Sequence, residues 1–136
     1  MDMDKLKTMR NLGNPFAAYT GIETTAIDTG YAEALMTVRT EHLNPLGYVH
    51  GGCIYTMADI VSGSAVASYG YQAVTASGEY HYFSPAVNTK TLYATARTIK
   101  KGRALAITEV EISDDRGKLI GKGTFTHSIL KSEVQI

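Results

Sequence analysis

The sequence predicts an α+β fold in which one long helix packs against a five- to six-stranded antiparallel sheet. Residues 51–69 contain no proline and read as the helix. Four segments that alternate apolar and polar residues follow it, and one or two more precede it. Many strands beside a single long helix are typical of a fold with its helices on one face of an antiparallel sheet.

The length and composition predict one domain that associates with other copies. The 136 residues are the size of one ordinary domain, and no linker, repeat or low-complexity stretch divides them. We therefore expect a single domain over residues 1–136, with residues 1–14 as an N-terminal extension or short helix. Because 44% of the residues are hydrophobic and only 19% are charged, we expect an oligomer.

Charge, cysteine content and hydropathy exclude several functional classes. Thirteen basic residues balance thirteen acidic ones, which argues against a nucleic-acid partner held by phosphate neutralisation. The single Cys53 cannot form an intrachain disulfide, and no Cys/His spacing predicts a metal site. The N-terminus lacks the apolar core of a signal peptide, and no run of about 18 apolar residues could cross a membrane. We expect a soluble, cytoplasmic protein.

The segments before the long helix predict a short helix and a hairpin. Residues 4–11 could form the short helix, ended by Gly13 and Pro15. Residues 19–28 and 31–40 lie on either side of the turn signal Thr29-Gly30, and predict a hairpin beside the long helix.

The long helix is predicted from Gly51 to Tyr69, with Gly70 at the position of a C-terminal capping glycine. A loop built around Asn44-Pro45 and Gly47 leads into it. Gly63 in its interior costs about 1 kcal/mol relative to alanine if exposed, so a closely packed neighbour is one reason for a glycine there.

Four strands are predicted after the helix, at residues 74–83, 91–100, 103–113 and 118–130. The residues between these strands are typical of turns: Ser84-Pro85, Lys101-Gly102 and the run 114–117. We expect these strands to form a four-stranded meander.

Asp59 is the first candidate for chemistry, because it is the only acid in an otherwise apolar and small-residue helix. An ionised carboxylate in such a setting is costly unless it is paired or faces water. Perturbed acids often mark active sites, but structural carboxylates occur in the same settings, so both interpretations stay open.

The tripeptide His50-Gly51-Gly52 is the second candidate. Two glycines allow a ligand to approach the backbone closely, and the free N–H groups of a helix N-terminus can polarise a carbonyl or hold an oxyanion. The alternative is a tight turn into the helix with His50 in a structural role. No phosphate-binding GxxxxGK[ST] motif is present.

The spacing of these two candidates bears on how they could act together. Gly51 and Asp59 are eight residues apart, which is about 12 Å along one helix. One reacting carbonyl cannot easily reach both groups, since catalytic contacts are about 3 Å long. Two antiparallel copies of the helix would bring Gly51 of one chain near Asp59 of the other, so we expect a site shared across a homodimer if both groups act.

Other residues carry weaker signals. The serines at 62 and 64 lack a GxSxG motif, and Cys53 is expected to be a small core residue. The basic turn at Lys100-Lys101-Gly102-Arg103 is either a solvated turn or a site for a phosphate-bearing ligand such as coenzyme A.

The stretch HLNPLGYVHGGCIYTMAD resembles the signature of the hotdog-fold acyl-CoA thioesterases, in the branch of the phenylacetate-pathway thioesterases and thioesterase superfamily member 2. The resemblance continues through VTASGEYHYFSPA, the KKGR turn and GKLIGKGTFTH, and spans roughly residues 15–130. Gly78 and His81 depart from the pattern, in a strand that is usually more apolar.

The resemblance implies roles for particular residues. Asn44 and His50 would organise the loop and the water or thioester, and Gly51 would supply the N–H that polarises the carbonyl. Asp59 of the partner subunit would be the general base or the nucleophile, and Thr75 would help to orient the water. Four further residues would contact coenzyme A: Tyr82, Lys101, Arg103 and His127.

We therefore expect an enzyme that hydrolyses an acyl-CoA, aryl or short to medium in chain length, to the free acid and coenzyme A. The resemblance implies no metal or redox cofactor, no nucleic-acid or membrane partner, and a homodimer or homotetramer. Hotdog folds also occur in enoyl-CoA hydratases and in non-catalytic acyl-CoA-binding proteins, which are the alternatives. A hydratase would place a catalytic histidine with its acid, and His50 is the expected candidate for it.

Overall fold

The computed structural model describes residues 1–136. Helices α1 (Met3–Leu12) and α2 (Pro15–Thr20) open the chain, and β1 (Ile22–Asp28), β2 (Tyr31–Thr37) and the 3-10 turn η1 (Thr40–His42) follow them. The long helix α3 (Gly51–Ala67) comes next. The chain ends with four strands, β3 (Tyr71–Tyr82), β4 (Thr91–Lys101), β5 (Leu105–Asp114) and β6 (Leu119–Glu133).

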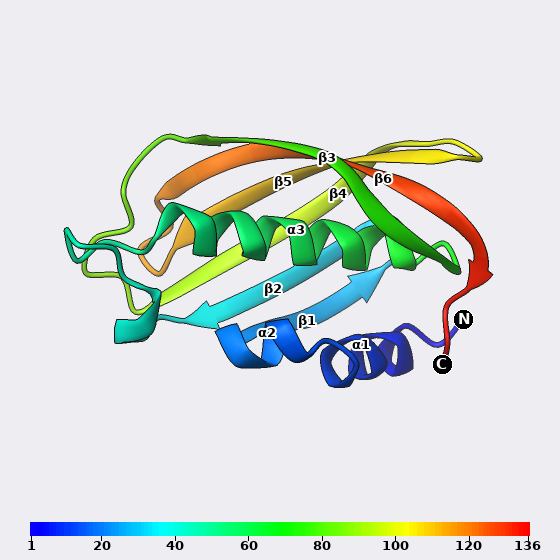
Figure 1. The fold of residues 1–136 in the computed structure, drawn as a ribbon, viewed down its shortest axis with the longest axis horizontal. Helices are drawn as coiled ribbons and strands as arrows, with labels where there is room; N and C mark the ends of the chain where they lie inside the picture. The colour runs from blue at the N-terminus through cyan, green and yellow to red at the C-terminus, as the bar shows by residue number, and fades with distance from the viewer.

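All six strands form one antiparallel sheet in the order β1-β2-β4-β5-β6-β3, and the sheet curves around α3 (Figure 1). This arrangement confirms the predicted hotdog fold, with one long central helix wrapped by an antiparallel sheet. The predicted hairpin is also confirmed as β1–β2, turning at Gly30 with a φ of +66°.

The predicted four-stranded meander is wrong in one respect. Strand β3 pairs with β6, from Tyr71 opposite Glu133 to Tyr82 opposite Gly121, and does not pair with β4. Tight turns join β4 to β5 and β5 to β6, but residues 83–90 join β3 to β4 and carry the chain across to the edge of β2. Strand β3 therefore lies at one edge of the sheet.

Pro15 begins a second helix, whereas the sequence predicted that it would only end the first. Asn14 caps α2, since its Oδ1 accepts the Ala17 N–H at 3.0 Å. Proline at the first helical position costs no hydrogen bond, because that N–H has no partner within a helix. Gly21, with a φ of +77°, ends α2 and lets β1 start at Ile22, later than the predicted residue 19.

Helix α3 supplies the centre of the core. Its side chains pack with those of β1, β2, β4 and β5, and Met57, Ala58 and Val61 are completely buried. The helix ends at Ala67, two residues before the predicted Tyr69. No helix is both long and apolar enough to span a membrane.

Glycines allow α3 and the sheet to approach closely. A Cβ on Gly63 would lie 3.2 Å from Nη2 of Arg10 and 3.6 Å from Nε2 of His127, so the closely packed neighbour expected at this glycine is present. A Cβ on Gly78 would collide with the Tyr55 hydroxyl and the Phe125 ring. The unusual glycine in β3 therefore makes room for two aromatic rings whose centroids are 5.1 Å apart.

Candidate active site

The loop that leads into α3 is organised by Asn44. Its Oδ1 accepts the N–H groups of Leu46 at 2.9 Å and Tyr48 at 3.1 Å, and its own N–H donates to the Tyr48 carbonyl. Gly47 completes the turn with a φ of +80°. These bonds hold the short loop in a fixed shape, directly before the glycines of the helix start.

His50 caps α3, because its Nδ1 accepts the Gly52 N–H at 2.9 Å. The proton of the neutral ring is then on Nε2. The Tyr82 hydroxyl donates to the Gly51 carbonyl at 2.7 Å. The Gly51 N–H has no acceptor within the chain, so it is a free donor at the positive end of the helix dipole, as a group that polarises a carbonyl must be.

The second part of the site is centred on Asp59, half-buried on the outer face of α3. The Thr75 hydroxyl donates to Oδ1 of Asp59 at 2.6 Å, and Nε2 of His127 lies 3.3 Å from the same hydroxyl. Thr75 and His127 are directly opposite each other on β3 and β6, so the two strands hold both side chains on one face of the sheet. The sheet thus positions the carboxylate of the helix.

The hydrogen bonds that link Asp59, Thr75 and His127 fix the protonation of His127. Thr75 gives its only hydroxyl proton to Asp59, so it accepts from Nε2–H of His127. Nδ1 of His127 is then unprotonated, and it is buried without a partner. Burial lowers the pKa of His127, Asp59 opposes that shift, and Arg10 adds to it. His127 is therefore neutral near pH 7.

The structure brings the predicted catalytic residues together in two groups within one chain. Asn44, His50 and Gly51 lie at the start of α3. Asp59 lies about two turns further along the helix, where Thr75 of β3 is bonded to it. The rise of about 1.5 Å per residue separates the two groups by about 12 Å. No single carbonyl in one chain can contact both.

The four residues expected to contact coenzyme A are also divided. Tyr82 lies beside Gly51, and His127 is 2% exposed beside Thr75. Lys101 and Arg103 are exposed on the turn between β4 and β5, where Nζ of Lys101 lies 5.4 Å from the centre of the Tyr69 ring. His127 thus joins the Asp59 group instead of the exposed basic turn.

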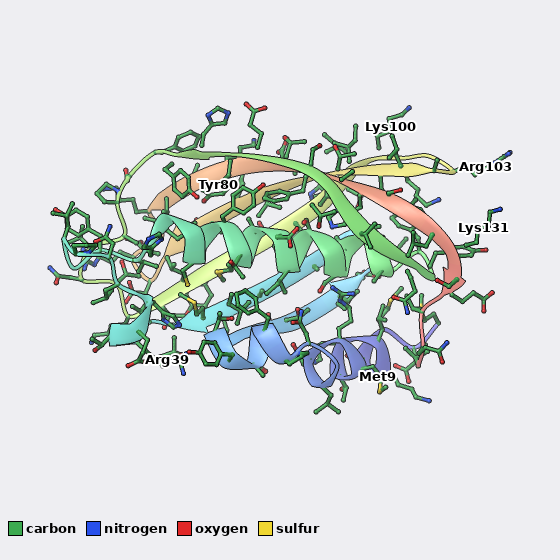
Figure 2. The ribbon with its side chains drawn as sticks, in the orientation of Figure 1. Met9, Arg39, Tyr80, Lys100, Arg103 and Lys131 are labelled. Atoms are coloured by element: carbon green, nitrogen blue, oxygen red, sulfur yellow. The ribbon has the colours of Figure 1, made fainter.

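Basic side chains gather at the end of the molecule that holds the β4–β5 turn. Figure 2 shows Lys100, Arg103 and Lys131 projecting from this end, and all three are exposed. This is the setting in which a phosphate-bearing ligand would be held by charge.

Arg10 of α1 is a site residue that the sequence analysis did not identify. It lines the same cavity as Asp59, Thr75 and His127, and its Nε donates to Oγ of Ser64 at 2.9 Å. A signal for it was present, because Arg10 follows the fully buried Leu6 by four residues and so lies on the same helical face.

Cys53 is a half-buried residue packed against the core, as expected. Its Sγ lies 3.5 Å from Sδ of Met36, and burial raises the pKa of the thiol. A thiol that is protonated at neutral pH is a poor nucleophile.

Comparison with known proteins identifies the family. The thioesterase superfamily model matches residues 46–120. Acyl-coenzyme A thioesterase 13 of Homo sapiens is 35% identical over 94 residues, which are 67% of this chain and 67% of that protein. Acyl-coenzyme A thioesterase PaaI of Escherichia coli is 30% identical over 100 residues, or 74% and 71% of the two chains. A match of 34% identity to a protein of Archaeoglobus fulgidus spans 63% of that protein.

Solved structures show the same fold. Escherichia coli PaaI superposes with a TM-score of 0.89 at 22% identity, over 98% of this chain and 100% of that one. A Streptococcus mutans protein bound to acetyl-CoA superposes with a TM-score of 0.78 at 25% identity, over 84% and 91% of the two chains. The chain belongs to the thioesterase superfamily, and its relatives place it among the acyl-CoA thioesterases of that superfamily.

Proposed function

We propose that this protein hydrolyses acyl-CoA thioesters to a free acid and coenzyme A, with Asp59 as the general base or nucleophile. The hydrogen-bonded chain Asp59–Thr75–His127 carries this proposal. Thr75 holds the carboxylate in one orientation, and neutral His127 fixes the direction of the Thr75 proton. The reaction needs no metal or redox cofactor, since water and a carboxylate are sufficient for it.

As a base, Asp59 takes a proton from water as the water oxygen bonds to the thioester carbon. The negative charge that develops on the carbonyl oxygen is stabilised by the Gly51 N–H. The tetrahedral intermediate then expels the coenzyme A thiolate, which takes up the proton. As a nucleophile, Asp59 would instead form an anhydride that water cleaves.

The Gly51 N–H in this reaction belongs to the partner subunit of a homodimer. The separation of about 12 Å along α3 supports this arrangement, and so does the surface of the chain. Gly52, Thr56 and Asp59 recur at helical spacing on the outer face of α3, and the small side chains of Gly52 and Thr56 allow a second helix to approach its N-terminal half closely.

Strand β3 has features of a strand that pairs with another chain. It is an edge strand of twelve residues, and edge strands of this length are normally covered. Large apolar side chains on it and directly after it are exposed: Tyr71 by 42%, Val74 by 52%, Tyr82 by 50% and Phe83 by 57%. We propose that β3 contributes to the dimer interface and that coenzyme A lies toward Lys101 and Arg103. A tetramer would be formed from two such dimers.

Thiol release from a panel of aryl, short and medium acyl-CoAs tests the proposed reaction. Asp59→Asn is the sharpest variant, because its amide oxygen can still accept the Thr75 hydroxyl while the base is lost. We expect kcat to fall roughly 10²- to 10⁴-fold, with Asp59→Ala at least as low. Binding of acyl-CoA by the wild type without thiol release would instead show a binding protein.

Hydration of an enoyl-CoA by the wild type would show a hydratase. For that reaction the structure changes the candidate histidine, because His127 and not His50 lies near Asp59. His127 contacts Thr75 and not the carboxylate, so thioester hydrolysis remains the better supported reaction.

A further inference from the structure

Arg10 is a mostly buried cation that uses only part of its hydrogen-bonding capacity. Its Nε donates to Oγ of Ser64 at 2.9 Å, and Ser64 in turn lies 3.2 Å from the Thr24 hydroxyl. The bond to Ser64 ties Arg10 to α3. The two terminal nitrogens make no hydrogen bond within the chain, and no carboxylate oxygen lies within 4.0 Å of them.

Arg10 lies where two cavities meet. One cavity, of about 250 Å³, contains Asp59, Thr75 and His127. The other, of about 310 Å³, is lined by Leu6, Met9 and residues near the C-terminus. Arg10, Asn14 and Gln72 line both cavities, so the space next to the proposed base continues past the guanidinium.

The boundary between the cavities is rich in donors. Asn14 uses its Oδ1 to cap α2, which leaves its side-chain N–H₂ free, and the Gln72 amide makes no hydrogen bond within the chain. Burial lowers the pKa of Arg10, and the charge of Asp59 opposes that shift. Because the terminal nitrogens of this mostly buried cation have no acceptor within the chain, a ligand oxygen placed here would gain a charge-assisted bond.

We propose that Arg10 is a specificity-determining residue that selects acyl groups carrying an acceptor oxygen (hydroxyl, keto or carboxylate) a few bonds beyond the thioester carbonyl. This inference rests on the proposed function, because it requires the carbonyl to react at Asp59. The acyl group then extends into the cavity beside Asp59, and its oxygen accepts from the terminal nitrogens of Arg10. A carboxylate would fit the planar fork of the guanidinium with two parallel bonds.

Three four-carbon substrates test this role: butyryl-CoA, 3-hydroxybutyryl-CoA and succinyl-CoA. They are matched in length and differ in the acceptor oxygen. We expect the wild type to have a higher kcat/KM for the two oxygen-bearing substrates than for butyryl-CoA. In Arg10→Met, the ratio of kcat/KM for these substrates to that for butyryl-CoA should fall roughly ten- to a hundredfold, because one charged hydrogen bond is lost.

Arg10→Lys, which keeps the charge but not the fork, should give an intermediate ratio. Lys5→Met is the matched control, because it removes an exposed charge from the same helix, and it should leave the ratio unchanged. If Arg10→Met does not fold, as judged by its thermal melting, Arg10→Lys and Arg10→Gln serve in its place.

The result that would overturn the inference is an unchanged substrate ratio in folded Arg10 variants of an active enzyme. A wild type that hydrolyses none of a broad acyl-CoA panel would instead refute the proposed function itself. The two failures are therefore distinguishable.

Discussion

At the scale of single residues, the proposed reaction depends on two groups that lie apart within one chain. One is the Gly51 N–H, free at the start of α3, and the other is the Asp59 carboxylate, held by Thr75. Each can be altered with little disturbance of its surroundings.

Gly51→Pro is expected to remove the proposed oxyanion donor while keeping the helix start. Proline is favoured at the first position of a helix, and His50 already has a φ of −59° and a ψ of 135°, which suit a residue before proline. Loss of one such donor should lower kcat by about 10²- to 10³-fold. Gly51→Ala keeps the N–H, and its Cβ would lie at an ordinary 3.5 Å from the Tyr82 ring.

Steady-state kinetics of thiol release should therefore show a far smaller loss for Gly51→Ala than for Gly51→Pro. Equal losses in two folded variants would mean that the N–H itself is not used.

His127 predicts a pH dependence of stability. Its pKa in the folded protein is below the ordinary value of 6.5, so between these two pKa values the unfolded chain binds a proton that the folded chain does not. The free energy of unfolding should then be fully retained above about pH 6.5 and fall as pH decreases below it. Urea unfolding from pH 5 to 8 measures this.

The variant His127→Gln should lose this part of the pH dependence. The control is His81→Gln, which alters an exposed histidine paired with Glu79 and should retain it. A wild-type slope that persists in His127→Gln would assign the effect to another group.

At the scale of elements, the contact between α3 and β3 decides the geometry of the site. Thr75 reaches Asp59 because β3 crosses close to the helix, and Gly78 allows that crossing by leaving space for Tyr55 and Phe125. A bulge in β3 between Thr75 and Ser77 adjusts the register against β6 at the same place.

Gly78→Ala should therefore destabilise the protein by about 1–3 kcal/mol, the usual cost of overpacking a core. Denaturant unfolding measures it, with Ser77→Ala as the control because Ser77 is exposed on the same strand. If Gly78→Ala were as stable as the wild type, the close approach of α3 and β3 would not be required.

The sequence predicted elements well where local pattern decides them and less well where pairing does. Helix α3, the β1–β2 hairpin and the segments that became β3 to β6 follow from spacing and turn residues. The pairing of β3 with β6 depends on contacts between segments about fifty residues apart, which no local pattern contains. Helix α2 was missed because Pro15 can either end one helix or begin the next.

The candidate site was predictable in part for the same reason. Asp59, Gly51 and Asn44 lie in one continuous motif, and Thr75 follows from the family resemblance. Arg10 comes from a separate helix, and His127 comes from a distant strand. Only the tertiary structure places them beside Asp59.

At the scale of the whole molecule, the proposed active site requires two chains. The free N–H and the carboxylate are on one helix face about 12 Å apart, and β3 leaves an uncovered edge with apolar side chains. A charge on that edge should weaken the association. Val74→Lys is expected to shift the protein toward monomer in light scattering or sedimentation. Leu12→Lys is the control, because Leu12 is 78% exposed on α1.

A monomeric wild type that hydrolyses acyl-CoA at full rate would contradict the shared site. A dimer that Val74→Lys leaves intact would place the interface elsewhere.

Mixed dimers test most directly whether each active site takes Asp59 from one subunit and the Gly51 N–H from the other. Gly51→Pro and Asp59→Asn chains are produced together, and thiol release from a good substrate is compared with that of each variant alone. In a mixed dimer one site contains both altered residues and the other contains neither. Random pairing should therefore restore about a quarter of the wild-type activity. Mixed dimers that form, as shown by differently tagged chains, but stay as inactive as either variant alone would contradict the shared site.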